Sequence, residues 1–396
     1  MRTALGLVTA ITAVLATAVP ASAAAPIQTT LPAPTGHERL GSVELHLVDQ
    51  NRQDPWGGTG RRELMVTVTY PARDTERYPL APWLPTNTTE AFRAAVAKAL
   101  DVDLSAVRFP VGRSHSGAPA RPGEHPVLLY SPGYGMERGL GASQVEELAS
   151  RGYVVVSIDH PGDAGAVQFP DGHLEPSRQP PMPTDPAQQK QVIGKALDVR
   201  VADTRFVLDQ LAVLARGDNP DAERRPLPRG LGRALDLSHP AMFGHSLGGA
   251  TAAQVMTEDR RVAAGVDLDG TLFGSVADSG LDRPFLLMGA GTHGRGDDPT
   301  WASFWSHTTG WHRELSLPAG AHMGYTDLQQ VVAQLVRAKV IPAEKAVPPI
   351  GTVDADRSTS AQRAYLDAFF DLQVRHCDSG LLDGPSSRYP EIEFIP

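Results

Sequence analysis

Short apolar runs alternate with longer amphipathic segments along most of the chain. The runs at 126–131 and 153–158 are mostly apolar, as expected of strands that are buried on both faces of a parallel sheet. Similar runs predict further strands at 45–48, 64–70, 240–243, 262–268, 285–288 and 314–317. Apolar residues at helical spacing predict a long helix over 188–216, and shorter helices are expected over 143–151, 249–256 and 361–372. This alternation predicts an α/β fold with a doubly wound, mostly parallel sheet and helices on both faces.

The same pattern indicates a single domain without internal repeats. Residues 24–39 are rich in Ala, Pro and Thr and predict a flexible N-terminal segment, which leaves one large domain over 40–396. The proline-rich stretch 160–185 follows a strand, at the sheet edge where ligands of open α/β sheets bind. It is therefore either a loop that shapes a substrate pocket or a solvated excursion without a role. The stretch 216–239 is interpreted as scaffolding on the opposite edge.

The N-terminus predicts export. Arg2, the apolar stretch 5–19 and the small residues Ala21-Ser22-Ala23 have the pattern of a secretory signal peptide over 1–23, cleaved near Ala23. The apolar stretch is shorter than the roughly 20 residues that a membrane-spanning helix needs. We therefore expect a secreted protein without a transmembrane segment.

Charge and cysteine content narrow the possible partners. The formal net charge is −9 and the chain has no basic cluster, so nucleic acid and anionic membrane surfaces are not expected as partners. The lone Cys377 cannot form an intrachain disulfide. The expected protein is a monomer held together by its core.

The octet from Phe243 to Ala250 carries the strongest chemical signal. It contains Gly244-His245-Ser246-Leu247-Gly248 between a predicted strand and a predicted helix. A Gly-x-Ser-x-Gly in this setting is the nucleophile elbow of α/β-hydrolases, in which a strained turn exposes the serine hydroxyl at the top of the sheet. The flanking glycines avoid clashes with the neighbouring strand and helix. Ser246 is therefore the candidate nucleophile.

A serine nucleophile needs a base, and in this fold the base follows the nucleophile and the acid along the chain. The histidines after Ser246 are His293, His307, His312, His322 and His376. His322 lies in a small-residue turn after the last predicted strand, where a base can reach over the sheet edge. His322 is therefore the candidate base.

The candidate acid is less narrowly defined. Asp269 ends the predicted strand next to the elbow strand, only 23 residues after Ser246. Asp297 and Asp298 follow the next strand, where many α/β-hydrolases carry their acid. Asp267, deeper in the sheet, is interpreted as structural. Asp269 is preferred and the Asp297/Asp298 pair remains the alternative.

Backbone N–H groups are expected to stabilise the oxyanion that forms when the serine attacks. One is the N–H of Leu247, directly after the nucleophile. The loop Ser131-Pro132-Gly133-Tyr134-Gly135-Met136 follows an early strand, and its glycines allow close approach of the backbone. The N–H of Tyr134 is the second candidate donor.

Taken together, these motifs resemble the platelet-activating factor acetylhydrolases of the plasma and type II kind and their bacterial lipase-like relatives. The resemblance runs from about Ser42 to Asp327. Its segments are Trp83-Leu84-Pro85, Ser131-Pro132-Gly133-Tyr134-Gly135, Ile158-Asp159-His160, the elbow, Leu268-Asp269-Gly270 and His322-Met323-Gly324-Tyr325-Thr326-Asp327. The resemblance implies Asp269 as acid and His322 as base. Unlike the animal members, this chain has Pro132 in place of a histidine and a longer proline-rich loop.

The resemblance implies a secreted serine esterase that acts on short-chain esters, including the acetyl group of a phospholipid. No cofactor is expected, and no His/Cys cluster has the spacing of metal ligands. Three alternatives stay open: a lipase or cutinase-like polyester hydrolase, a serine peptidase on the same fold, and a non-catalytic binding protein on a hydrolase scaffold.

Overall fold

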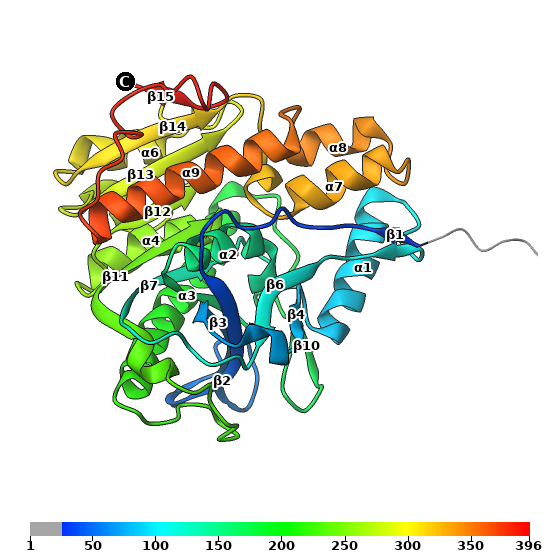
Figure 1. Cartoon of the computed structure of the whole chain (residues 1–396). Helices are drawn as coiled ribbons and strands as arrows, with labels where there is room; N and C mark the ends of the chain where they lie inside the picture. Colours follow the sequence, from blue (N-terminus) through cyan, green and yellow to red (C-terminus); the bar gives the residue numbers. More distant parts are fainter. Residues whose placement is uncertain (1–25) are drawn as a thin grey trace, which may run out of the picture.

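The computed structural model describes residues 26–396, so the predicted signal peptide lies outside the described residues. Within them, the main sheet has eleven strands in the order β15-β14-β13-β12-β11-β7-β8-β3-β2-β6-β4 (Figure 1). Their bounds are β2 (Arg39–Gln53), β3 (Arg61–Ala72), β4 (Leu80–Pro82), β6 (Val111–Ser116), β7 (His125–Ser131), β8 (Val154–Asp159), β11 (Leu235–His245), β12 (Gly265–Leu268), β13 (Phe285–Ala290), β14 (His312–Leu317) and β15 (Glu393–Ile395). From β8 to β14 the strands are parallel, while β3, β2 and β15 join as antiparallel neighbours.

The helices cover both faces of this sheet. They are α1 (Thr86–Leu100), α2 (Ala142–Ser150), α3 (Pro186–Ala215), α4 (Leu247–Glu258), α5 (Val276–Ser279), α6 (Pro299–His307), α7 (Leu328–Arg337), α8 (Ala343–Ile350) and α9 (Ala355–Val374). Helices α2 and α9 contact each other on one face, and α3 and α4 contact each other on the other (Figure 1). The predicted doubly wound, mostly parallel sheet with helices on both faces is confirmed.

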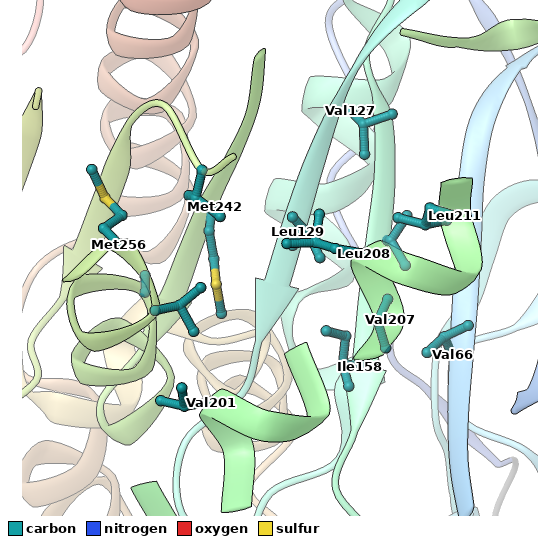
Figure 2. Close-up of a cluster of buried hydrophobic side chains, with 14 of the residues drawn as sticks. Val66, Val127, Leu129, Ile158, Val201, Val207, Leu208, Leu211, Met242 and Met256 are labelled. Atoms are coloured by element: carbon teal, nitrogen blue, oxygen red, sulfur yellow. The ribbon is translucent and has the colours of Figure 1, made fainter. Parts of the chain in front are cut away.

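Alternate residues of the central strands fill two cores. On β7, Val127 and Leu129 join the core under α3 and α4, whereas Leu128 and Tyr130 join the core under α2 and α9. Figure 2 shows the first core, where Leu208 and Leu211 of α3 point at the sheet. Burial on both faces explains why these strands are continuous apolar runs in the sequence.

A third core lies at one end of the molecule and includes two helices, α1 and α8, that the sequence pattern did not predict. Helix α7, which begins at Leu328 as expected from the sequence, also contributes to it. There α1 packs with the Trp83-Leu84 segment and with α7 and α8. Phe92 of α1 and Trp83 meet edge to face, with their ring centroids 5.5 Å apart. Among the described residues, no helix is long and apolar enough to cross a membrane.

Residues 26–39 differ from the expected flexible segment. Strand β1 (Ile27–Gln28) pairs with β5 (Val107–Arg108), and Thr35 donates from its N–H and hydroxyl to Glu147 at 2.7 and 2.5 Å. Arg363 of α9 donates to the carbonyls of Pro32 and Ala33. Long-range polar contacts of this kind leave no trace in local composition, which is why the sequence pattern suggested a loose segment.

The stretch 160–185 contains a small hairpin, β9 (Ala166–Gln168) and β10 (Leu174–Pro176). Its first residues turn inward, because His160 and Asp163 are fully buried. The stretch 216–239 also contributes the first half of β11 and the buried Asp221, which accepts from the N–H of His46 at 3.1 Å. The base of each stretch is therefore part of the folded framework.

Candidate active site

Ser246 occupies the strained turn between β11 and α4. Its φ of 55° and ψ of −125° lie in a region that costs a non-glycine residue about 1–3 kcal/mol. A Cβ on Gly244 would lie 2.2 Å from the carbonyl carbon of Gly248, and one on Gly248 would lie 1.9 Å from the carbonyl oxygen of Ser131. The N–H of Ser246 donates to Leu268 at 2.8 Å, which ties the turn to the end of β12. The elbow geometry expected from the sequence is present.

Asp269 follows β12 directly, and its side chain accepts three hydrogen bonds from donors among the described residues. Its Oδ2 accepts from Nδ1 of His322 at 2.6 Å, and its Oδ1 accepts from the N–H of Ala290 at 2.7 Å and from Nδ1 of His293 at 2.9 Å. Its own N–H donates to Met288 in the neighbouring strand. Burial raises the pKa of Asp269, but the hydrogen bonds from His293 and His322 outweigh burial and hold the pKa below its ordinary value. Asp269 is thus a carboxylate that faces two imidazoles.

The alternative acids lie elsewhere. Asp298 begins α6, where it accepts from the N–H of Thr300 at 2.8 Å, and its Oδ2 faces Nε2 of His293 at 3.0 Å. Asp297 is exposed. The carboxylate that contacts His322 is therefore that of Asp269. Asp298 contacts His293, which lies between Asp298 and Asp269.

Asp267, two residues before Asp269, is fully buried and behaves differently. Its Oδ1 accepts from the N–H of Gly270 at 2.9 Å and would lie 1.8 Å from a Cβ on Gly249. Burial raises the pKa of Asp267 well above its ordinary value, and the nearby His293 offsets only part of this. Asp267 packs against the first turn of α4, and its structural role stays a prediction from the sequence.

His322 begins a 3₁₀ turn (His322–Tyr325) after β14, and its side chain is 48% exposed. Its carbonyl oxygen accepts from Nε2 of His245 at 2.9 Å, and the two rings lie 4.6 Å apart. Burial, together with the nearby His322, lowers the pKa of His245 to about 3, so His245 is a neutral donor. His245 directly precedes Ser246, so this contact places the candidate base beside the elbow.

Hydrogen bonds from Arg200 of α3 fix the backbone of the loop from Ser131 to Met136. Arg200, fully buried, donates to the carbonyl oxygens of Pro132 and Gly133, and its Nε donates to Asp163 at 2.6 Å. Asp163 in turn accepts from the N–H of Gly135 at 3.0 Å. Between these anchors the N–H of Tyr134 makes no hydrogen bond within the described residues.

Leu247 supplies the other candidate donor. It is the first residue of α4, so its N–H has no intrahelical acceptor and lies at the positive end of the helix dipole. The close approach of Gly248 to Ser131 brings this helix end against the loop that carries Tyr134. Both N–H groups named from the sequence therefore belong to segments in contact with each other.

A second Ser–His–Asp arrangement lies under the same loop. Ser131 Oγ and Nε2 of His160 are 3.0 Å apart, and Nδ1 of His160 and Oδ2 of Asp203 are also 3.0 Å apart. All three residues are fully buried. Asp203 also accepts from Arg62, at 3.0 Å to Nε and 2.6 Å to Nη2. We refer to Ser131, His160 and Asp203 as the inner array.

Sequence reasoning missed three residues that hold the site together: His245, His293 and Arg200. His245 occupies the variable position of the Gly-x-Ser-x-Gly motif, and Arg200 falls within an amphipathic helix, where an arginine is ordinarily solvated. His293 was named only as one of several downstream histidines. The available signal was the position of His293, five residues before Asp298 in the loop that follows β13. This loop leaves the sheet at the same edge as Asp269, which follows β12.

A cavity of about 470 Å³ lies on the α2 side of β2, β3 and β8. The segment Trp83–Thr86 and Glu137 form part of its wall, and burial raises the pKa of Glu137 to about 8. None of the described residues that line it is Ser246, Asp269 or His322. The cavity is therefore separate from the candidate nucleophile and base. Among the described residues, no group of three or more His, Cys, Asp or Glu side chains is arranged to hold a metal ion.

Comparison with known proteins gives a consistent picture. A family model described as platelet-activating factor acetylhydrolase, isoform II, matches residues 24–378. A relative from Arthroderma benhamiae, named a probable 1-alkyl-2-acetylglycerophosphocholine esterase, is 31% identical over 409 residues, which cover 98% of each chain. A platelet-activating factor acetylhydrolase from Cavia porcellus is 24% identical over 283 residues, covering 66% of this chain and 60% of its own.

A solved structure is also similar over nearly the whole chain. The ferulic acid esterase from Streptomyces cinnamoneus is 37% identical and superposes with a TM-score of 0.75, covering 93% of this chain and 99% of that one.

Proposed function

The chain belongs to the platelet-activating factor acetylhydrolase isoform II family and is a carboxylic ester hydrolase of the α/β-hydrolase type, and we propose that it cleaves short-chain esters with Ser246, His322 and Asp269. The observation that carries this proposal is the 2.6 Å hydrogen bond between Asp269 and His322, beside the strained turn of Ser246. Because Nδ1 of His322 donates its hydrogen bond to Asp269, Nε2 of His322 is the atom that can take a proton.

The proposed reaction has two halves. Ser246 attacks the ester carbonyl while Nε2 of His322 takes its proton, and the imidazolium then protonates the leaving alcohol. Water releases the acyl group by the same route. The N–H groups of Tyr134 and Leu247 donate hydrogen bonds to the oxyanion. Each such donor stabilises the transition state by about 2.7–4 kcal/mol.

The first candidate substrate is the acetyl ester of a platelet-activating-factor-like phospholipid. It is supported by the name of the Arthroderma benhamiae relative, which matches this chain over almost its full length. The second candidate is a feruloyl ester, supported by the Streptomyces cinnamoneus esterase, which is 37% identical. A lipase-like or cutinase-like activity on longer or polymeric esters is the remaining alternative.

A substrate panel separates these candidates. Acetyl, butyryl and longer 4-nitrophenyl esters, an acetylated ether phospholipid with and without its phosphocholine head, and methyl ferulate would be compared by kcat/KM. A phospholipid esterase should prefer the acetyl ester that carries the phosphocholine head. Preference for methyl ferulate would select the second candidate, and rates that rise with acyl length would select the lipase-like alternative.

Ser246→Ala tests the mechanism itself. The variant should lose at least about 10⁴-fold in kcat on the best substrate, as expected when a serine nucleophile is removed. It should also fail to react with a fluorophosphonate probe that labels the wild type. Substantial remaining turnover, with an unchanged thermal transition, would contradict the assignment of Ser246.

Secretion and a monomeric state belong to the same proposal. Residues 1–23 have the signal-peptide pattern, so the exported protein should begin near Ala24. Mass spectrometry of protein recovered from the culture medium tests this, and sedimentation of the same material tests the monomer.

A further inference from the structure

His293 lies between two carboxylates, and its two ring nitrogens face one each. Nδ1 is 2.9 Å from Oδ1 of Asp269 and Nε2 is 3.0 Å from Oδ2 of Asp298. A neutral imidazole has a single N–H, so it would turn a lone pair towards one of the two carboxylates. Only the imidazolium form donates to both. The geometry therefore makes His293 a cation.

Burial lowers the pKa of His293, but the hydrogen bonds to Asp269 and Asp298 outweigh burial and raise the pKa to about 10. The neighbours on all sides support a fixed charge. The ring packs 4.6 Å from the ring of Trp301 in α6. From β12, burial raises the pKa of Asp267 well above its ordinary value, which disfavours its charged form.

Two further charged neighbours, Glu314 of β14 and Arg295 of the loop before α6, neutralise each other. Glu314 accepts from the N–H of Arg295 at 3.0 Å and also pairs with the Arg295 side chain. On the His322 side, His245 is neutral, and Tyr325 donates its hydroxyl to Gly289 at 2.9 Å. The nearby titratable groups therefore form one row: Asp298, His293, Asp269 and then His322.

We propose that His293 is a positioning residue for the reaction. As a permanent imidazolium it orients Asp269 and reduces the degree to which Asp269 stabilises the protonated form of His322. This inference rests on the proposed function, because it assigns Asp269 and His322 as acid and base. A carboxylate alone would favour the charged form of His322. With the cation of His293 on its other oxygen, Asp269 still fixes the tautomer of His322 but raises its basicity less, so His322 stays neutral at lower pH.

Three variants test the inference. His293→Asn keeps a donor that can reach Asp269 but removes the charge. Asp298→Asn removes the outer carboxylate while keeping a residue that caps helices well. Asp297→Asn is the matched control, because Asp297 is the adjacent, exposed carboxylate. The readout is the pH dependence of kcat/KM with 4-nitrophenyl acetate, whose acid limb reports the free base.

In His293→Asn the acid limb should move to higher pH by about one unit, as expected when a neighbouring charge is removed. The plateau at high pH should stay within about tenfold of wild type, the size of a lost neutral hydrogen bond. Asp298→Asn removes a more distant negative charge while His293 stays a cation paired with Asp269, so the limb should move slightly to lower pH. Asp297→Asn should not shift it. An unmoved limb with a lowered plateau in His293→Asn would mean a purely structural role and would overturn the inference.

A spectroscopic measurement on Ser246→Ala gives a readout without turnover. Nitrogen-15 NMR of its histidines should show both nitrogens of His293 protonated at pH 8, and the His293→Asn change in the same background identifies the signal. Titration of His293 near the ordinary histidine pKa would overturn the inference. If instead Ser246→Ala retained full turnover, the proposed function would fail, so the two failures are distinguishable.

Discussion

Two Ser–His–Asp arrangements lie at the same edge of the sheet, on the adjacent strands β7 and β11. In the inner array Ser131 ends β7, and in the outer set Ser246 follows β11, where Gly244 pairs with Ser131. His160 of the inner array is fully buried, whereas the side chain of His322 is 48% exposed. The histidine of the inner array is therefore closed off from solvent, whereas the candidate base His322 is accessible.

The charges around the two acids differ as well. Asp203 of the inner array is bonded to Arg62 and Arg52. Burial, with Arg200 nearby, outweighs the hydrogen bond to Asp203 and keeps the pKa of His160 below its ordinary value. Arg200 also approaches the Ser131 hydroxyl, at 3.3 Å. Asp269 has no arginine among its hydrogen-bond partners in the described residues. Asp203 faces two arginines and a fully buried histidine. Asp269 faces a single further imidazole and a half-exposed histidine, so the surroundings of the two acids differ even though both bind a histidine.

Exchanging the two acids for asparagine should give the largest contrast. Asp269→Asn should lower kcat by about 10³- to 10⁴-fold with a nearly unchanged stability, because His322 loses the partner that fixes its tautomer. Asp203→Asn should lower the free energy of unfolding by about 3–5 kcal/mol, because the buried Arg62 loses its hydrogen-bonded carboxylate and keeps only Asp54, at 3.9 Å. Urea unfolding and ester kinetics on both variants measure this.

The matched control is Asp209→Asn, an exposed aspartate on the same helix as Asp203. It should change stability by no more than about 0.5 kcal/mol. If Asp203→Asn removed activity while leaving stability intact, the distinction between the inner and outer acids would be wrong.

The contrast also marks what sequence could predict. The elbow around Ser246 could be predicted because its glycines, strand and helix are contiguous, and the chain order pointed to His322. Asp269 and His322 are 53 residues apart, so only the fold brings them together. The inner array could not be predicted, because burial of His160 and its arginine neighbours depends on how α3 packs under the sheet. Helix α1 was missed because its short apolar stripe, centred on Phe92, is completed only by the third core.

Ser131→Ala should have a smaller effect and sharpens the contrast between the two serines. The hydroxyl of Ser131 contributes one neutral hydrogen bond to His160, typically worth about 0.5–1.5 kcal/mol. Its loss should reduce kcat/KM by no more than about tenfold through small shifts of the loop that carries Tyr134. Fluorophosphonate labelling should remain complete. Loss of labelling in Ser131→Ala with retention in Ser246→Ala would reverse the assignment of the two serines.

The smallest expected effect concerns the pH dependence of stability in His160→Asn. The pKa of His160 is lowered in the folded state by burial. Below the ordinary histidine pKa of about 6.5, His160 binds a proton in the unfolded chain but not in the folded one. The stability that His160 contributes is therefore present above pH 6.5 and is lost as the pH falls. Between pH 7.5 and 5.5 the free energy of unfolding should fall by about 1 kcal/mol more in the wild type than in His160→Asn, measured by urea unfolding at both pH values.

The control is His239→Asn, which changes an exposed histidine and should follow the wild type. Equal losses in wild type and His160→Asn would mean that His160 titrates freely, and the inner array would then differ from the outer one by access alone.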